Sequence, residues 1–206
     1  MAISFPVSSR TARISSGQKK VVYYPQVYGM TNHRLEMFIN QTIVAQVQRL
    51  IDEQVGNMPT TVEEMLGAYE MKNNQREVLS LSLSNYTYHS QAAHGMTYIK
   101  SLTYDLKNGK LCQLKDLFKP GSNYIQRLSE LIKLQIKERD IQTLDGFSTI
   151  RPDQDFYIAD KTLVIYFQLY EITPYVFGFP MFPIAVYDIE DIIKEDGPLG
   201  RMVVNN

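Results

Sequence analysis

Residues 163–193, LVIYFQLYEITPYVFGFPMFPIAVYDIEDII, hold the densest aromatic and β-branched content of the sequence. Residues 163–170 are apolar at nearly every position, which is typical of a strand buried on both faces. The backbone is expected to turn several times over residues 171–182, because that segment contains Pro174, Gly178 and Pro180. A second short strand is predicted at Phe182–Val186, and a closing helix at Asp188–Lys194 with three isoleucines on one face. This stretch specifies a core and indicates no reaction.

Two long helices are predicted outside this stretch from apolar residues that recur at intervals of three and four. The first follows Asn32, a favourable N-cap residue, and ends near Gly56. The second covers Tyr124–Asp140 and follows two polar residues that can cap it. A shorter helical turn is predicted at Thr60–Gly67 from its threonine and glutamate residues.

The predicted strands follow one another as hairpins. Leucine alternates with serine in Glu77–His89, which predicts a half-buried strand, and Asn108–Gly109 is a strong hairpin signal. A turn is expected at Asn73–Asn74, and Pro25 places the strand Lys19–Tyr28 at an edge or breaks it. The remaining predicted strands are Ala68–Lys72, Met96–Leu106, Lys110–Leu114, Asp155–Ile158 and Thr162–Leu169. Hairpin connections favour an α+β fold with a mainly antiparallel sheet and helices packed on one face.

The length of 206 residues suits one domain or two tightly joined subdomains. We expect an N-terminal arm at residues 1–18, either frayed or an edge strand, and a subdomain with a strand and the long helix at 19–75. A C-terminal domain at 76–195 and a mobile tail at 196–206 follow, the whole forming one compact unit.

Composition excludes several classes of function. Lys+Arg is 21 and Asp+Glu is 22, a net charge of −1, which argues against a general nucleic-acid binder. The single cysteine, Cys112, can form neither an internal disulfide nor a multi-thiolate zinc site, and we expect it in the core. The sequence has no apolar run of membrane-spanning length and no signal-peptide h-region. As written it is therefore expected to be soluble and not exported by the usual route; the oligomeric state stays open.

The sequence contains no assembled catalytic motif, and we predict that the protein is not an enzyme. It has no G-x-S-x-G, no P-loop and no G-x-G-x-x-G, so neither a nucleophile elbow nor a cofactor is predicted. His89 and His94 lie five residues apart and His33 is distant, whereas zinc requires three or four ligands. No metal site is predicted, and both histidines are expected to bond backbone groups around a loop at 91–95. The rival hypothesis is a hydrolase of cell-wall polysaccharide that uses both histidines, a carboxylate and a bound metal.

Aromatic residues supply the candidate binding site. The chain has 14 Tyr and 9 Phe but no Trp, and tyrosine is both a common interface residue and a common strand residue. A turn-rich loop can hold exposed aromatic side chains in place. In an extended segment, alternate aromatic residues at 175, 177 and 179 would share one face. The candidate contact residues are Pro174, Tyr175, Phe177, Phe179 and His94.

Three stretches together resemble one family. SLTYDLKNGKLCQLKDLF (101–118) resembles its Asp-x-x-x-Gly hairpin followed by Leu-x-Asp-Leu-Phe. LSLSLSNYTYHSQAAHG (79–95) resembles the preceding strand and Ala-His-Gly loop, and FYIADKTLVIYFQLYEITPYVFG (156–178) resembles the Tyr-Glu-Ile-x-Pro-Tyr-x-x-Gly signature. The family is the C-terminal domain of RsiV-like anti-sigma factors, which also occurs in PdaC-type peptidoglycan deacetylases. Residues 19–75 resemble the companion domain that precedes it.

The resemblance implies an extracytoplasmic binding or sensor module, which in the anti-sigma factors recognises lysozyme. The expected partner is therefore a lysozyme-like protein or a peptidoglycan fragment, and a structural interaction protein is a further alternative. The sequence lacks the sigma-binding segment, the membrane helix and the deacetylase domain, so those activities are not expected to carry over. The signature also implies a turn at Pro174 and a positive φ at Gly178.

Overall fold

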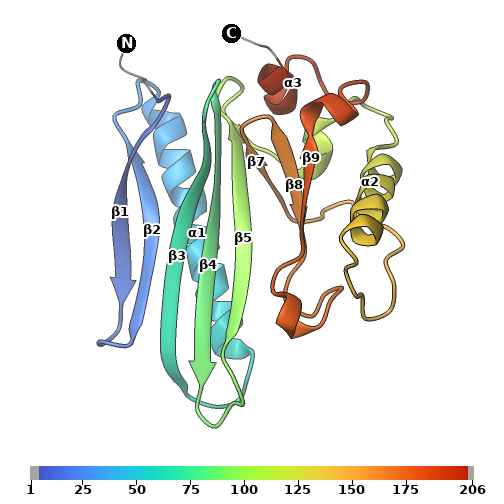
Figure 1. Cartoon of the computed structure of the whole chain (residues 1–206). Helices are drawn as coiled ribbons and strands as arrows, with labels where there is room; N and C mark the ends of the chain where they lie inside the picture. Colours follow the sequence, from blue (N-terminus) through green and yellow to red (C-terminus); the bar gives the residue numbers. More distant parts are fainter. Residues whose placement is uncertain (1–4, 204–206) are drawn as a thin grey trace.

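Nine β-strands and three α-helices are formed by residues 5–203, the part of the chain that the computed structural model describes (Figure 1). The strands are β1 Ser8–Ser15, β2 Lys20–Tyr28, β3 Val62–Gln75, β4 Val78–His89, β5 Met96–Asp105, β6 Lys110–Leu111, β7 Phe156–Ala159, β8 Thr162–Tyr166 and β9 Met181–Ala185. The helices are α1 His33–Gly56, α2 Tyr124–Glu138 and α3 Pro198–Val203. The strands form two sheets, ordered β1-β2-β3-β4-β5-β6 and β7-β8-β9, rather than the expected single sheet. All pairs except β2–β3 are antiparallel, so the predicted α+β class is confirmed.

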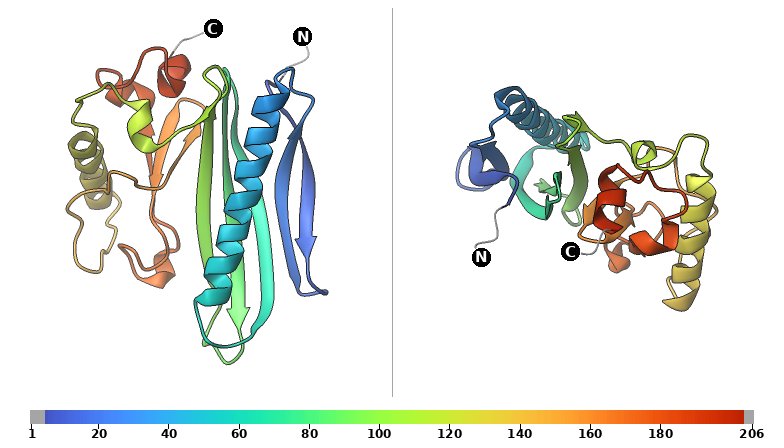
Figure 2. Two further views of the ribbon diagram at one scale, coloured as in Figure 1. Left: turned by 180° about the vertical axis from the view of Figure 1, so that it is seen from behind. Right: turned by 90° about the horizontal axis from the view of Figure 1, so that it is seen from above.

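The helix α1 packs along one face of the six-stranded sheet, as Figure 2 shows from behind. The side chain of Asn32 accepts a hydrogen bond from the backbone N of Leu35 at 3.1 Å, so the predicted cap is confirmed. The buried stripe of the helix meets the leucines of β4 in one core. Its main members are Leu35, Ile39, Ile43, Val47 and Leu50 of α1 and Leu79, Leu81 and Leu83 of β4.

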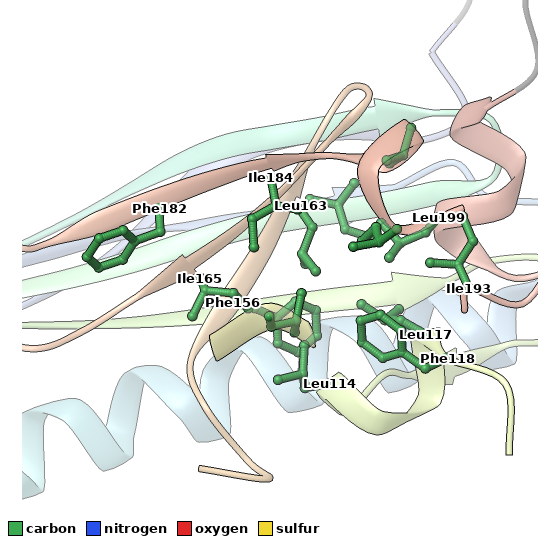
Figure 3. Packing of buried hydrophobic residues seen from close by; sticks show 14 of the residues in the cluster. Leu114, Leu117, Phe118, Phe156, Leu163, Ile165, Phe182, Ile184, Ile193 and Leu199 are labelled. Carbon is green, nitrogen blue, oxygen red and sulfur yellow. The ribbon is translucent and has the colours of Figure 1, made fainter. Parts of the chain in front are cut away.

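The smaller sheet and α2 enclose a second core, away from α1 (Figure 2). Figure 3 shows aromatic and aliphatic side chains from β7, β8, β9 and the segment 114–118 converging there. The labelled residues are Leu114, Leu117, Phe118, Phe156, Leu163, Ile165, Phe182, Ile184, Ile193 and Leu199. The hairpin predicted between β7 and β8 is present, with Asp160 at φ 49°.

The strand β4 is buried on both faces, so its predicted half-buried character is wrong. Its leucines face α1, whereas Ser80 is fully buried on the opposite side. The hydroxyl of Ser80 lies 2.8 Å from that of Thr103 and accepts a hydrogen bond from the backbone N of Ile158 in β7 at 3.1 Å. Serine can be buried here because its hydroxyl is bonded, and its small size lets β7 approach the larger sheet closely.

The prediction of a closing helix at Asp188–Lys194 is wrong. A 3-10 turn at Val186–Ile189 replaces it, and Phe118 and Ile193 form an isolated β-bridge. Helix α3 begins at Pro198, where the helix was expected to have ended, since proline at the first helical position loses no hydrogen bond. Leu199 and Met202 are fully buried, so the predicted mobile tail is packed up to residue 203. Residues 204–206 lie outside the described part of the chain.

The strand β3 replaces two other predicted features. The expected helical turn at Thr60–Gly67 and the expected turn at Asn73–Asn74 both fall largely within this strand, which pairs with β4 along its length. The chain instead turns at Arg76 and Glu77, both with positive φ. The asparagines act as partners for backbone groups: Asn73 Nδ2 donates to the carbonyl of Val78 at 2.7 Å, and the Asn74 amide bonds both backbone groups of residue 7. The subdomain boundary expected at 75/76 falls at this turn, inside one sheet.

The strand β2 is unbroken at Pro25, with β1 as its antiparallel partner. Only Lys20–Val22 of β2 pairs with β3, so Pro25 lies beyond the residues that pair with β3. Further along, the side-chain amide of Asn40 in α1 bonds both the N and the O of Val27 at 2.9 Å.

The expected N-terminal edge strand is present as β1, and residues 1–4 of the expected arm lie outside the described residues. On the C-terminal side, the strand predicted at 163–170 ends at Tyr166.

Arg201 ties α3 to the end of β5 by an ion pair and to the turn between β3 and β4 by hydrogen bonds. Arg201 lies 2.8 Å from the carboxylate of Asp105 and donates to the carbonyls of Arg76 and Glu77 at 3.0 and 3.2 Å. Burial alone would raise the pKa of Asp105, but hydrogen bonds from Asn108 and the charge of Arg201 outweigh it, so the pKa lies below its usual 3.8.

We predict that Ser80→Ala lowers the free energy of unfolding by about 1–3 kcal/mol, because it leaves the buried backbone N of Ile158 without an acceptor. Urea denaturation measures this change. Ser84→Ala is the matched control on the same strand, since Ser84 is only half-buried. Equal effects of the two substitutions would contradict the role given to Ser80.

We also predict an acid-dependent contribution from Asp105. Because its pKa is lowered on folding, the advantage of the wild type over Asp105→Asn in free energy of unfolding is full above about pH 5 and shrinks as the pH falls through and below 3.8. Urea titrations of both proteins across this range measure it. A difference that stays constant down to about pH 2 would contradict this linkage.

Candidate functional site

Two loops from opposite halves of the chain contact each other. The first, residues 90–95, joins β4 to β5, and the second, residues 167–180, joins β8 to β9. Their contact consists of three rings: the imidazole of His94 and the phenols of Tyr170 and Tyr175. We call these three residues the aromatic cluster.

The rings of the aromatic cluster pack directly on one another. The centroid of His94 lies 4.6 Å from that of Tyr175 and 6.5 Å from that of Tyr170. The two tyrosine rings are 5.4 Å apart. The hydroxyl of Tyr170 lies 3.3 Å from Nε2 of His94, and the hydroxyl of Tyr175 donates to the carbonyl of Gly95 at 3.4 Å. The two loops therefore hold each other in one arrangement.

The loop 167–180 is fixed to the scaffold at its start. The side-chain amide of Gln168 bonds both backbone groups of Ile99 in β5, at 3.1 and 2.7 Å, as a neighbouring strand would. Glu171 accepts a hydrogen bond from the backbone N of Gln168 at 2.7 Å and forms an ion pair with Arg151 at 2.6 Å. Hydrogen bonds thus fix the residues on both sides of Tyr170.

Tyr170 itself has a φ of 63°, which is uncommon for a bulky residue. A backbone held in this region costs of order 1–3 kcal/mol, and such positions cluster at functional sites. Tyr170 is nevertheless 45 % exposed, so the strained backbone presents a phenol ring to solvent instead of filling the core.

The predicted extended segment with aromatic residues on one face is wrong. Residues Tyr175–Phe177 form a 3-10 turn, closed by a hydrogen bond from the backbone N of Phe177 to the carbonyl of Pro174 at 3.0 Å. Gly178 follows at φ 66°, so the turn at Pro174 and the positive φ at Gly178 are both confirmed. With three residues per turn, consecutive side chains of this segment point in different directions.

The turn projects apolar surface into solvent next to the aromatic cluster. Val176 is 85 % exposed and Phe177 is 44 % exposed, whereas Pro174 and Phe179 are half-buried. The structure therefore brings Tyr175 and His94 of the candidate residues into contact and places Phe177 at the tip. Sequence reasoning missed Tyr170 and Val176. Tyr170 is one of many tyrosines, and Val176 resembles an ordinary core residue; no pattern marks either as exposed.

The remaining histidine of the pair, His89, is buried in the scaffold. Its Nδ1 lies 3.0 Å from the carbonyl of Thr60 and its Nε2 lies 2.8 Å from that of Gln54. Nδ1 of His94 contacts the carbonyl of Gly95 at 2.9 Å, so the prediction that both histidines bond backbone groups is confirmed. His89 thus has no ring nitrogen left for a metal, and residues 5–203 contain no group of three or more His, Cys, Asp or Glu residues placed to hold one.

Cys112 is a core residue, as predicted, and not an activated nucleophile. Burial, followed by the negative charge of Asp105, raises the pKa of its thiol to about 11. The thiolate that nucleophilic catalysis requires is therefore disfavoured at neutral pH.

Residues 115–186 match the family described as "Protein of unknown function (DUF3298)". This match contains the loop 167–180 but not the His94 loop. Over 181 residues the chain is 29 % identical to "Anti-sigma-V factor RsiV" of Bacillus subtilis (strain 168), a match that covers 82 % of this chain and 63 % of the relative. It is 21 % identical over 177 residues to "Peptidoglycan-N-acetylmuramic acid deacetylase PdaC" of the same strain, covering 77 % of this chain and 38 % of that protein. The chain thus spans less than two thirds of either relative.

Two solved structures share the fold. A DUF3298 family member from Bacteroides fragilis NCTC 9343 gives a TM-score of 0.71 at 14 % identity, covering 96 % of this chain and 98 % of that one. A DUF3298 family protein from Pseudomonas aeruginosa PAO1 gives 0.67 at 15 % identity, covering 93 % and 95 %. The RsiV-like resemblance is therefore supported across the DUF3298 segment, and the companion domain at 19–75 stays a prediction. Within residues 5–203, no helix has the length and apolar character needed to cross a membrane.

We predict that Gly178→Ala destabilises the loop 167–180, because a φ of 66° with a ψ of −141° is close to a region that only glycine enters readily. The free energy of unfolding should fall by about 1–3 kcal/mol, measured by urea denaturation. Gly56→Ala, where no positive φ and no neighbouring atom opposes a methyl group, is the control and should leave the free energy of unfolding unchanged or slightly raised. A neutral Gly178→Ala would show that the loop tolerates another conformation.

Proposed function

We propose that this chain is a non-catalytic binding module whose contact surface is the aromatic cluster together with Val176 and Phe177. The observation that carries the proposal is the exposed, rigidly held Tyr170, whose strained backbone serves no core packing. Strain of this kind persists only where the surrounding structure enforces it, and here the enforced result is an exposed aromatic surface.

The chemistry of this surface favours a protein partner. Preorganised tyrosines bury large area at little entropic cost, and a protruding Val–Phe turn fits an apolar pocket on a partner. The 29 % identity to an anti-sigma factor supports a sensor-type module, and the family resemblance makes a lysozyme-like protein the partner to test first. A cell-wall glycan, which could stack on the same rings, is the alternative outcome of the test.

The rival hydrolase finds little support in the arrangement of side chains. The two histidines that this hypothesis assigns to the metal have different contacts. Both ring nitrogens of His89 face backbone carbonyls, whereas the ring of His94 packs against those of Tyr170 and Tyr175. The 21 % identity to a deacetylase covers only 38 % of that relative, so its activity does not transfer.

We predict that Tyr175→Ala weakens binding to a c-type lysozyme by about 2 kcal/mol or more, roughly 30-fold in Kd, as expected for the loss of a central aromatic residue. Val176→Asp should weaken it similarly while leaving stability intact, because this side chain is 85 % exposed. Biolayer interferometry with immobilised lysozyme measures both, with peptidoglycan fragments tested in parallel.

The matched control is Tyr23→Ala in β2. Tyr23 and Tyr175 are both 39 % exposed, and Tyr23 lies in β2 of the six-stranded sheet, whereas Tyr175 lies in the loop 167–180. It should leave Kd unchanged. If glycan fragments bind and lysozyme does not, the protein-partner assignment is wrong. If the wild type binds neither, or binds but ignores both substitutions, the proposed surface is wrong.

A further inference from the structure

A separate apolar pocket opens between the β1–β2 hairpin, the C-terminal end of α1 and the start of β3. Its volume is about 410 Å³, within the range of about 300–1,000 Å³ that is usual for small-molecule sites. The apolar part of its lining comes from all three elements: Ile14, Val22, Ile51, Val55, Val62 and Met65. Ile14 is 37 % exposed and Val55 is 51 % exposed, so the pocket is open to solvent on the side where these residues lie.

One charged side chain, Lys20, lines this pocket, beside the hydroxyl residues Ser15, Ser16, Thr60 and Thr61. Lys20 is half-buried and forms no ion pair with any residue of the described chain, 5–203. An ammonium group at the edge of an apolar pocket attracts an anionic group, and hydroxyls beside it can donate further hydrogen bonds.

The walls of the pocket are held in place without a ligand. The carbonyl of Lys20 accepts a hydrogen bond from the backbone N of Ser16 at 2.9 Å, and the carbonyl of Lys19 accepts one from Met65 at 2.9 Å. On the opposite wall, the backbone N of Ser90 donates to the carbonyl of Thr61 at 2.8 Å. A bound molecule would therefore meet a preformed site.

We propose that this pocket binds a small amphipathic anion: an aliphatic chain in the apolar interior, with one carboxylate paired to Lys20. The size selects a medium-chain molecule, and the single unpaired lysine selects a monoanion over a neutral lipid. This site lies on other residues than the aromatic cluster and does not depend on the function proposed for that cluster.

Isothermal titration calorimetry with decanoate, below its micelle concentration, tests the proposal on the full chain. Wild type should bind one equivalent saturably. Lys20→Met should weaken binding about tenfold or more, since a charge-assisted hydrogen bond is lost. Lys19→Met is the matched control, because Lys19 is an exposed neighbour that does not line the pocket, and it should change Kd less than about twofold.

A second pair of variants tests the apolar wall. Val55→Asp places a negative charge at the pocket and should abolish decanoate binding, whereas Val44→Asp, on an exposed part of the same helix, should not. Thermal unfolding verifies that all variants fold. The proposal is overturned if wild type shows no saturable binding, if Lys20→Met and Val55→Asp bind as well as their controls, or if decanol binds as tightly as decanoate.

Discussion

The double burial of β4 is the constraint on which the rest of the structure depends. Leu79, Leu81 and Leu83 face the core under α1, and Ser80 and Ser82 face the second sheet. The strand β4 lies between α1 on one side and the smaller sheet on the other, so it must present large apolar groups on one face and small, hydrogen-bonded groups on the other. A leucine at position 80 would push β7 away, and a serine at 81 would leave a hole beneath α1.

The position of the aromatic cluster follows from that arrangement. Because β7–β9 packs against the larger sheet, the loop leaving β8 passes the end of β5, and Gln168 bonds Ile99 there. Lys100 of β5 adds an ion pair at 2.9 Å with Asp155, which directly precedes β7. These contacts hold the loop 167–180 beside the loop that carries His94, although Tyr170 and His94 are 76 residues apart in sequence. The cluster exists only when both sheets are assembled.

Local patterns in the sequence predicted the elements whose cause is local. The α1 helix, the hairpin at Asp160 and the positive φ of Gly178 follow from a cap residue, a turn and a missing side chain. The errors have long-range causes. Ser80 is buried because β7 supplies a donor, Asn74 lies in a strand where the distant backbone of Val7 bonds its amide, and α3 forms where its apolar residues meet the second core. No window of the sequence contains those partners.

The features of the candidate site also divide into those with local causes and those with long-range causes. The composition of the segment 171–180 was enough to indicate a rigid, aromatic turn, but the direction of each ring depends on contacts across the two sheets. Tyr170 illustrates the difference: its neighbours Gln168 and Glu171 are fixed by Ile99 and Arg151, and the strained φ between them is a consequence. A residue placed by such distant constraints carries no local signature. Its exposure nevertheless separates it from core tyrosines such as Tyr166, whose hydroxyl bonds Ser101 and whose ring is fully buried.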